Sequence, residues 1–287
     1  MSPHNGITPF YFGLPDKPLF GCYHKPRAGR DRQCAAVICQ PMGHEYINCH
    51  RALRHLASRL ADAGFPVLRF DYYGCGDSAG EPADGGIARW MKDISAAISE
   101  IKTWTSLSDV CVIGVRLGAA LATLTAVQNG GFESLVLWDP VVEGRGYLQE
   151  LLSLQKEMLR FRPKPIRRKC LSGFIEVLGF PLSNDLCSEL EKINLLQISK
   201  KPARNVLIIR SCQSGDEGAL EGHLNQSEAS TTGDLLDIPK VWLPTVDGSL
   251  LVPNKALQSV VSWSREFTHE RTSCRLWRVE LADWDRN

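Results

Sequence analysis

The stretch CVIGVRLGAALA, residues 111–122, contains the pattern that points most directly to chemistry. An apolar run rich in β-branched residues ends at Gly114, Gly118 follows, and small helix-forming residues come next. In the pattern G-x-S-x-G, two such glycines permit a sharp turn that raises a nucleophilic serine above a sheet. Here the central residue is Arg116, whose guanidinium stays protonated and cannot attack a carbonyl. The pattern therefore predicts the backbone of a nucleophile site that carries a cation.

A buried Arg116 requires a nearby anion, because an unpaired guanidinium inside a protein costs several kcal/mol. Asp139, at the end of the apolar segment LVLWDP, is the preferred internal partner, since it would lie at the same carboxyl edge of the sheet. The alternative is a ligand carboxylate or phosphate held by the planar fork of Arg116. The two arrangements can alternate, with the internal pair opening when a ligand enters.

The loop PMGHEY, residues 41–46, holds the best-placed histidine, His44, a candidate general base or hydrogen-bond donor. It could equally be an ordinary loop histidine. The backbone around Met42 and Gly43, together with the N–H of Leu117, would supply the two donors of an oxyanion hole. Glu45 could be a partner in the site, although we expect it to be a solvated surface residue.

The glycine-rich segment DYYGCGDSAG, residues 71–80, contains further polar groups. Asp71 and Asp77 are expected to cap turns and the start of a helix. Ser78 is an alternative hydroxyl for which we expect a structural role. Cys75 is the one cysteine considered for chemistry, and a reactive thiol would need a cationic neighbour.

Strand-like and helix-like segments alternate along the chain and must position these residues. The expected order is a hairpin over 8–26, strands beginning at 34, 65, 109 and 132, and helices over 48–63, 87–104 and 118–131. After residue 203 come a strand, a polar stretch at 223–234, a last strand within 239–253 and a helix from 254. Continuous apolar strands that alternate with helices predict an α/β fold with a mostly parallel, doubly wound sheet.

The alternation breaks between 144 and 202, which we interpret as a helical cap inserted over the carboxyl edge of the sheet. Residues 1–143 and 203–287 then form the two parts of the core. The cap contains the basic cluster RFRPKPIRRK, residues 160–169. This cluster is either a solvated surface or a surface that binds an acidic carrier or partner protein. Its leucines, with Phe174 and Ile175, are expected to form an apolar ceiling over a pocket.

Charge, cysteine spacing and apolar runs bear on the partners, cofactors and location to be expected of the chain. The 33 basic and 32 acidic residues give a net charge of +1, which does not favour nucleic acid or an anionic membrane as partner. The ten cysteines lack zinc-like spacing, so we expect neither a metal site nor another cofactor. The sequence shows no signal peptide and no apolar run long enough for a membrane span, and we expect a cytoplasmic protein.

The order of the PMGHEY loop, the segment GFPVLRFDYYGCGDSAG, the elbow GVRLGA and the segment LVLWDPVVEGRGYLQEL resembles the α/β-hydrolase fold. The chain is similar to serine-aminopeptidase-like hydrolases, including the exosortase-associated hydrolases, over residues 8–266. That resemblance implies a helical cap and a triad of hydroxyl nucleophile, histidine and acid. Arg116 stands at the nucleophile position, and Asp216 is available for the acid. The place of the histidine reads LPTVDGSLLVP, which offers only Asp247, a candidate substrate-binding residue. His223 and His269 would have to fold back to reach the site.

Three functions remain open. The chain could bind a small acyl or carboxylate compound, free or carrier-bound, with Arg116 as anchor, His44 and the Leu117 amide as donors, and Asp139 or Asp216 as acid or base. It could instead be a non-catalytic pseudohydrolase that acts as a scaffold or partner subunit. A hydrolase with a relocated nucleophile is the third possibility. An empty apolar pocket with free polar groups favours the first, and a fully paired Arg116 in a filled pocket favours the second.

Overall fold

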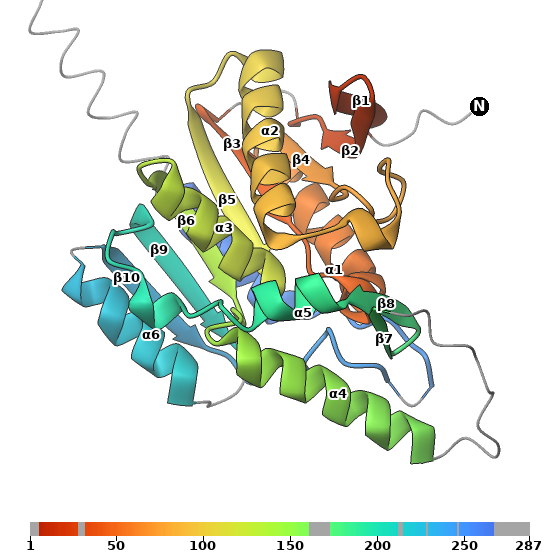
Figure 1. Cartoon of the computed structure of the whole chain (residues 1–287). Helices are drawn as coiled ribbons and strands as arrows, with labels where there is room; N and C mark the ends of the chain where they lie inside the picture. Colours follow the sequence, from red (N-terminus) through yellow and green to blue (C-terminus); the bar gives the residue numbers. More distant parts are fainter. Residues whose placement is uncertain are drawn as a thin grey trace, which may run out of the picture.

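A computed structural model describes residues 6–27, 32–160, 173–211, 215–227, 229–245 and 247–266. Its centre is an eight-stranded sheet with the order β1-β2-β4-β3-β5-β6-β9-β10. Helices cover both faces of this sheet (Figure 1). The predicted α/β class with a mostly parallel sheet is therefore confirmed.

The first two strands form the predicted hairpin. β1 (Ile7–Leu14) pairs antiparallel with β2 (Lys17–His24), and β2 pairs antiparallel with β4 (Val67–Phe70). The remaining neighbours are parallel; their strands are β3 (Cys34–Cys39), β5 (Asp109–Val115), β6 (Phe132–Trp138), β9 (Ala203–Arg210) and β10 (Ser230–Leu235). Their carboxyl ends share one edge of the sheet, where the elbow lies.

Two apolar clusters hold the helices against the sheet. On one face pack α2 (Ile87–Thr105), α3 (Leu117–Gln128) and α6 (Gly215–Gln226). On the other face pack α1 (Gly43–Asp62) and the helix at 254–266, which includes the buried Leu257 and Val260. A short 3₁₀ helix, η1 (Pro82–Asp84), precedes α2. Strands β3, β5 and β6 are apolar along most of their length because both of their faces are covered.

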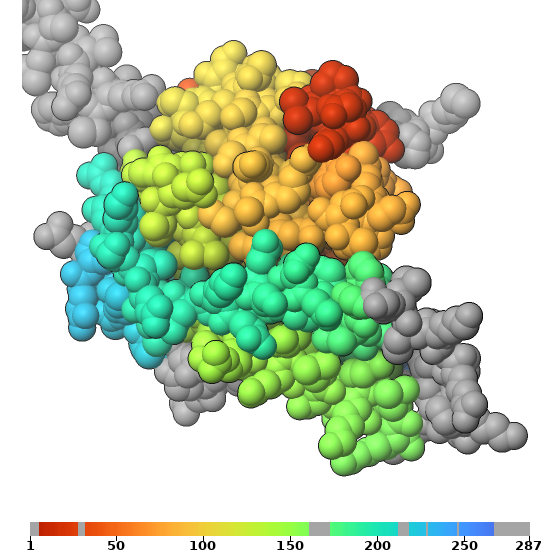
Figure 2. All heavy atoms as spheres, in the orientation of Figure 1, coloured from red at the N-terminus to blue at the C-terminus, as the bar shows by residue number. Residues whose placement is uncertain are grey.

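The segment between β6 and β9 lies across the carboxyl end of the core (Figures 1 and 2). It contains α4 (Gly144–Arg160), the antiparallel strands β7 (Phe174–Val177) and β8 (Phe180–Ser183), α5 (Asn184–Leu190) and η2 (Leu195–Gln197). The insertion is thus mixed and not purely helical. Apart from Arg160, the basic cluster lies outside the described residues. The division into core and cap domains stays a prediction.

The predicted C-terminal order is wrong in one respect. The last strand among the described residues is β10 (Ser230–Leu235), which begins in the stretch 223–234 that the sequence suggested as a polar connection, and residues 241–243 form a turn. β10 lies at the edge of the sheet and its residues are exposed or half-exposed, so it lacks the apolar run that marks a central strand. The helix expected from 254 is present.

Candidate functional site

The predicted elbow is present between β5 and α3. Arg116 has φ 53° and ψ −121°, a strained conformation for a residue with a side chain. A Cβ atom on Gly118 would overlap the carbonyl oxygen of Cys39, and one on Gly114 would overlap the backbone of Ala119. The two glycines are therefore required by close backbone approach, as the sequence pattern predicts.

The side chain of Arg116 is held by two carboxylates. Its Nε donates to Oε1 of Glu45 at 2.9 Å, and its Nη2 donates to Oε2 of Glu150 at 2.6 Å. The hydroxyl of Tyr147 donates to the other oxygen of Glu45 at 2.8 Å. The side chains of Arg116 and Glu45 are 8% and 1% exposed, whereas that of Glu150 is 39% exposed. The network thus has a sealed partner and a solvent-facing partner.

Two aromatic rings complete the enclosure of the guanidinium. The Cζ of Arg116 lies 4.7 Å from the ring centroid of Trp242 and 5.3 Å from that of Tyr147. Both distances are within the range of cation–π attraction. Trp242 comes from the connection that follows β10, and Tyr147 comes from α4. Core and insertion therefore meet on this one cation.

The prediction that Asp139 pairs with Arg116 is wrong. Asp139 accepts hydrogen bonds from the backbone N–H of Ser211 at 2.7 Å and from its hydroxyl at 2.5 Å. These bonds join the ends of β6 and β9. Burial raises the pKa of Asp139, and the bonds from Ser211 only partly oppose this effect. Asp139 therefore has a structural partner of its own.

The expectation that Glu45 is a solvated surface residue is also wrong. The sequence suggested that the first long helix begins near Asn48, but α1 begins at Gly43 and so includes Glu45 in its first turn. A carboxylate is favourable there because the helix dipole is positive at its N-terminus. This earlier start places Glu45 in the interior, where it reaches Arg116.

The charges in the network oppose the effect of burial. Burial disfavours the charged form of Arg116, but Glu45 and Glu150 outweigh it and raise the pKa of the guanidinium above its ordinary value. Burial raises the pKa of Glu45, although the charge of Arg116 and the hydrogen bonds from Arg116 and Tyr147 counteract it. The charged form of Glu45 therefore depends on Arg116.

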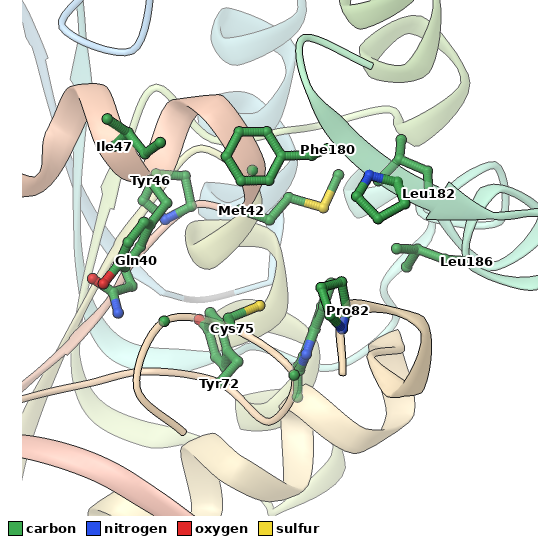
Figure 3. Close-up of a pocket in the computed structure, with 16 residues that line it drawn as sticks. Gln40, Met42, Tyr46, Ile47, Tyr72, Cys75, Pro82, Phe180, Leu182 and Leu186 are labelled. Carbon is green, nitrogen blue, oxygen red and sulfur yellow. The ribbon is translucent and has the colours of Figure 1, made fainter. Parts of the chain in front are cut away.

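An apolar cavity of about 230 Å³ lies between the loop before α1, the loop after β4 and the β7–β8 hairpin (Figure 3). The network residues Arg116, Glu45 and Glu150 are not among its lining. Among its lining residues are Met42, Tyr46, Cys75, Phe180, Leu182 and Leu186. The amide of Gln40 and the hydroxyl of Tyr46 both donate to Asp71, at 2.5 and 3.1 Å. These two polar groups are thus already bonded, whereas the buried hydroxyl of Tyr72, which also lines the cavity, has no hydrogen-bond partner in the described structure. Most of the lining residues are apolar.

Comparison with known proteins assigns the family. Residues 35–191, more than half of the chain, match the family described as serine aminopeptidase, S33. The chain belongs to this α/β-hydrolase family. Human ABHD12B is 38% identical to it over 80 residues, which are 27% of this chain, and the match spans only 21% of the length of ABHD12B.

Solved structures of other α/β-hydrolases show the same fold. Est1E from Butyrivibrio proteoclasticus, with bound ferulic acid, is 16% identical with a TM-score of 0.59, over 92% of this chain and 99% of Est1E. An esterase from Pyrococcus furiosus is 14% identical with a TM-score of 0.61, over 91% of each chain. At such identities the likeness concerns the fold alone.

Two features of the sequence bear on the triad that the resemblance to hydrolases implies. Arg116 is at the elbow, and residues 236–253, which connect β10 to the last described helix, contain no histidine. From this connection Trp242 packs on Arg116 instead. The side chain of Asp216, in α6, lies outside the described residues. His223 is bonded through Nε2 to the carbonyl of Ile198 at 2.8 Å and belongs to another part of the molecule.

The remaining predicted site residues are divided between the interior and the surface. His44 is half-buried; burial, followed by the charge of Arg116, lowers its pKa to about 4. Its Nε2 is buried without a hydrogen-bond partner in the described structure. Gly43 and Met42 line the cavity, and the buried Leu117 begins α3.

The predicted site residue Asp247 and the alternative hydroxyl Ser78 make other contacts. Asp247 is exposed and accepts from the backbone N–H of Ser249 at 3.1 Å. Ser78 has the expected structural role, because its hydroxyl donates to the carbonyl of Asp71 at 2.6 Å and accepts from the N–H of Phe20 at 2.8 Å.

Sequence reasoning missed Glu150 and Tyr147 as partners in the network. They lie three positions apart on α4, and such positions share one face of a helix. An acidic and an aromatic residue at this spacing in the inserted segment was the available signal. Within the described ranges no group of acidic, histidine and cysteine residues is arranged to hold a metal ion. No helix in these ranges is both long and apolar enough to cross a membrane.

Proposed function

We propose that this chain binds a small acyl-bearing compound without hydrolysing it. The observation that carries the proposal of binding is the apolar cavity between the core and the β7–β8 hairpin. The enclosure of Arg116 at the elbow by Glu45, Glu150 and Trp242 supports the absence of hydrolysis. Acyl transfer through a serine requires a hydroxyl and a histidine that accepts its proton. At the elbow stands Arg116, which has no hydroxyl, and residues 236–253 after β10 contain no histidine.

The cavity supports binding of an apolar group. An apolar cavity of about 150 Å³ is large enough for a benzene-sized guest, and this one measures about 230 Å³. Its walls come from the loop at residues 40–43 and from the β7–β8 hairpin, so a guest would lie between the core and the insertion (Figure 3). A short acyl chain or a substituted aromatic ring fits this space and chemistry.

Octanoate and p-nitrophenyl octanoate provide the test. The expected result is saturable binding of octanoate without release of p-nitrophenol from the ester and without labelling by a fluorophosphonate. Leu182→Trp should abolish binding because the new side chain fills the cavity that Leu182 lines. Leu196→Trp is the matched control, since Leu196 is 37% exposed and does not line the cavity.

The outcomes separate the alternatives. Stoichiometric fluorophosphonate labelling, or steady release of p-nitrophenol, would mean that the chain is a hydrolase with a relocated nucleophile. Failure of the folded protein to bind octanoate, its ester or any other small acyl compound would leave the partner-subunit function and refute ligand binding.

A second candidate is a carboxylate compound anchored by Arg116 itself. It is supported by the difference between the two partners, because Glu150 is 39% exposed while Glu45 is 1% exposed. A ligand carboxylate could replace Glu150 on Nη2 and leave the buried pair intact. Glu150→Ala should then strengthen octanoate binding relative to octanol binding. Equal effects on both compounds would exclude this anchoring.

A further inference from the structure

A second buried arginine, Arg69, lies in β4 and forms no ion pair with a described acidic residue. Arg69 is 8% exposed, and its Nε donates to Nε2 of His24 at 3.2 Å. Among the described residues it forms no other side-chain hydrogen bond and no ion pair. A neutral imidazole does not compensate a buried positive charge. Burial lowers the pKa of Arg69, and the charge of Asp71, two positions further along the chain, opposes this effect without forming an ion pair. The two Nη atoms therefore have no anion bound directly to them among the described residues.

The strand register places this guanidinium beneath α1. In β4 the side chains of Leu68 and Phe70 belong to the apolar cluster on the α2 face, whereas Val67 belongs to the cluster on the α1 face. Because side chains alternate along a strand, Arg69 shares the α1 face with Val67. Its neighbour across the antiparallel pair is Cys22 of β2.

The surface beside Arg69 is formed by one stripe of α1. Tyr46, His50 and Arg54 follow one another at a spacing of four residues, which aligns them on one side of the helix. The rings of Tyr46 and His50 contact each other with centroids 6.1 Å apart. His50 and Arg54 are exposed, so solvent reaches this stripe. Arg54, like Arg69, forms no ion pair with a described residue.

The acidic residues of the neighbourhood, Asp71 and Asp77, form no ion pair with Arg69 or Arg54 in the described structure. Asp71 accepts hydrogen bonds from Gln40 and Tyr46 on one oxygen and from the N–H of Asp77 on the other. Asp77 is exposed in the loop that follows β4. The charges of Arg69 and Arg54 both lower the pKa of His24, after the larger effect of burial, so both act on the same small space.

We propose that Arg69 and Arg54, with His50 between them on the stripe, form a binding site for a phosphate group. The planar fork of an arginine matches phosphate geometry, and two guanidinium groups match the charge of a phosphate monoester or of inorganic phosphate. The site lies outside the acyl cavity, of whose lining only Tyr46 is shared. It is therefore independent of the proposed function.

Calorimetric titration of the full chain tests the proposal, with inorganic phosphate, phenyl phosphate and acetate added at matched ionic strength in chloride buffer. The expected result is saturable binding of phosphate or phenyl phosphate at one site per chain, with acetate weaker than either. The tighter of the two phosphates identifies a free or an esterified ligand. Arg54→Gln should weaken binding by about tenfold or more, the loss expected for one charge-assisted contact.

Arg51→Gln is the matched control, because Arg51 is an exposed arginine of the same helix that is not among the charges acting on His24, His50 or Arg69. In NMR spectra, phosphate should move the imidazole signals of His24 and His50 and leave those of the exposed His55 unchanged. Because Arg69→Lys tests a buried residue, its fold should be checked by circular dichroism before its affinity is compared. Absence of saturable phosphate binding, or equal losses in Arg54→Gln and Arg51→Gln, would overturn the proposal.

Discussion

Replacement of Arg116 by alanine tests the central feature of the site. Arg116→Ala leaves Glu45, which is 1% exposed in the native chain, with only the hydroxyl of Tyr147 as a side-chain partner. Removal of one member of a buried ion pair costs on the order of 3–5 kcal/mol. Glu150 adds little to this figure, because its half of the network is partly exposed and screened. For a chain of this size, such a loss corresponds to a fall in Tm of roughly 6–20 °C.

The double variant Arg116→Ala, Glu45→Gln identifies the origin of that loss. Because Glu45→Gln removes the unpaired negative charge, it should recover part of the lost stability. Thermal unfolding of the two single variants and the double variant, monitored by circular dichroism, gives the coupling energy between Arg116 and Glu45. Asp139→Asn in the same background is the control, since Asp139 is bonded to Ser211 and not to Arg116. A rescue by Asp139→Asn as large as that by Glu45→Gln would refute the network as described. A loss below about 1 kcal/mol in Arg116→Ala would refute it as well.

The pH dependence of the variant has a definite sign. Without Arg116, burial raises the pKa of Glu45 above its unfolded value, because the main opposing charge is gone. The folded state then binds more protons than the unfolded state as the pH rises from the unfolded to the folded pKa, so stability falls over that interval. The stability difference between the native chain and Arg116→Ala should therefore be smaller at acidic pH than at pH 8. A constant difference would show that Glu45 does not carry the buried charge.

Three further outcomes are expected. Arg116→Ser should show no esterase turnover with p-nitrophenyl esters, since no histidine lies between 236 and 253 to accept the proton; turnover well above background would reveal a base elsewhere. Gly118→Ala should unfold or strongly destabilise the chain in thermal melts, because the added Cβ overlaps the carbonyl of Cys39; a native melting curve would mean that the elbow can relax. Cys75 should react with iodoacetamide only slowly at neutral pH and faster as the pH rises, because burial raises its pKa to about 12, and rapid labelling at neutral pH, located by peptide mass spectrometry, would contradict this.

The elbow and the sheet could be predicted because their signals are local. Gly114 and Gly118 each stand two positions from Arg116 at the end of an apolar strand, and backbone crowding permits little else at those two positions. β3, β5 and β6 read as continuous apolar runs because helices cover both of their faces. β10 gave no such signal, since an edge strand with half-exposed residues resembles a polar loop.

The partners of Arg116 could not be predicted because they depend on long-range contacts. Glu45 lies 71 positions and Glu150 lies 34 positions from Arg116 in the chain. Asp139 was a reasonable choice from strand topology, but the end of β9 competes for it through Ser211. Glu45 is buried because α1 begins at Gly43, earlier than the sequence suggested. Helix boundaries are the feature that sequence patterns define least well.

The strained elbow remains although the residue on it cannot act as a nucleophile. The backbone conformation of Arg116, with φ 53° and ψ −121°, destabilises the folded chain by on the order of 1–3 kcal/mol. Such a conformation persists only where the surrounding structure fixes it. Here the surroundings are Glu45 from α1, Tyr147 and Glu150 from α4, and Trp242 from the connection after β10. A serine in this turn would present its hydroxyl to a substrate, whereas Arg116 spans the gap and joins the core to the insertion. The strain that poises a nucleophile in a hydrolase therefore positions, in this chain, the cation that holds α4 over the sheet.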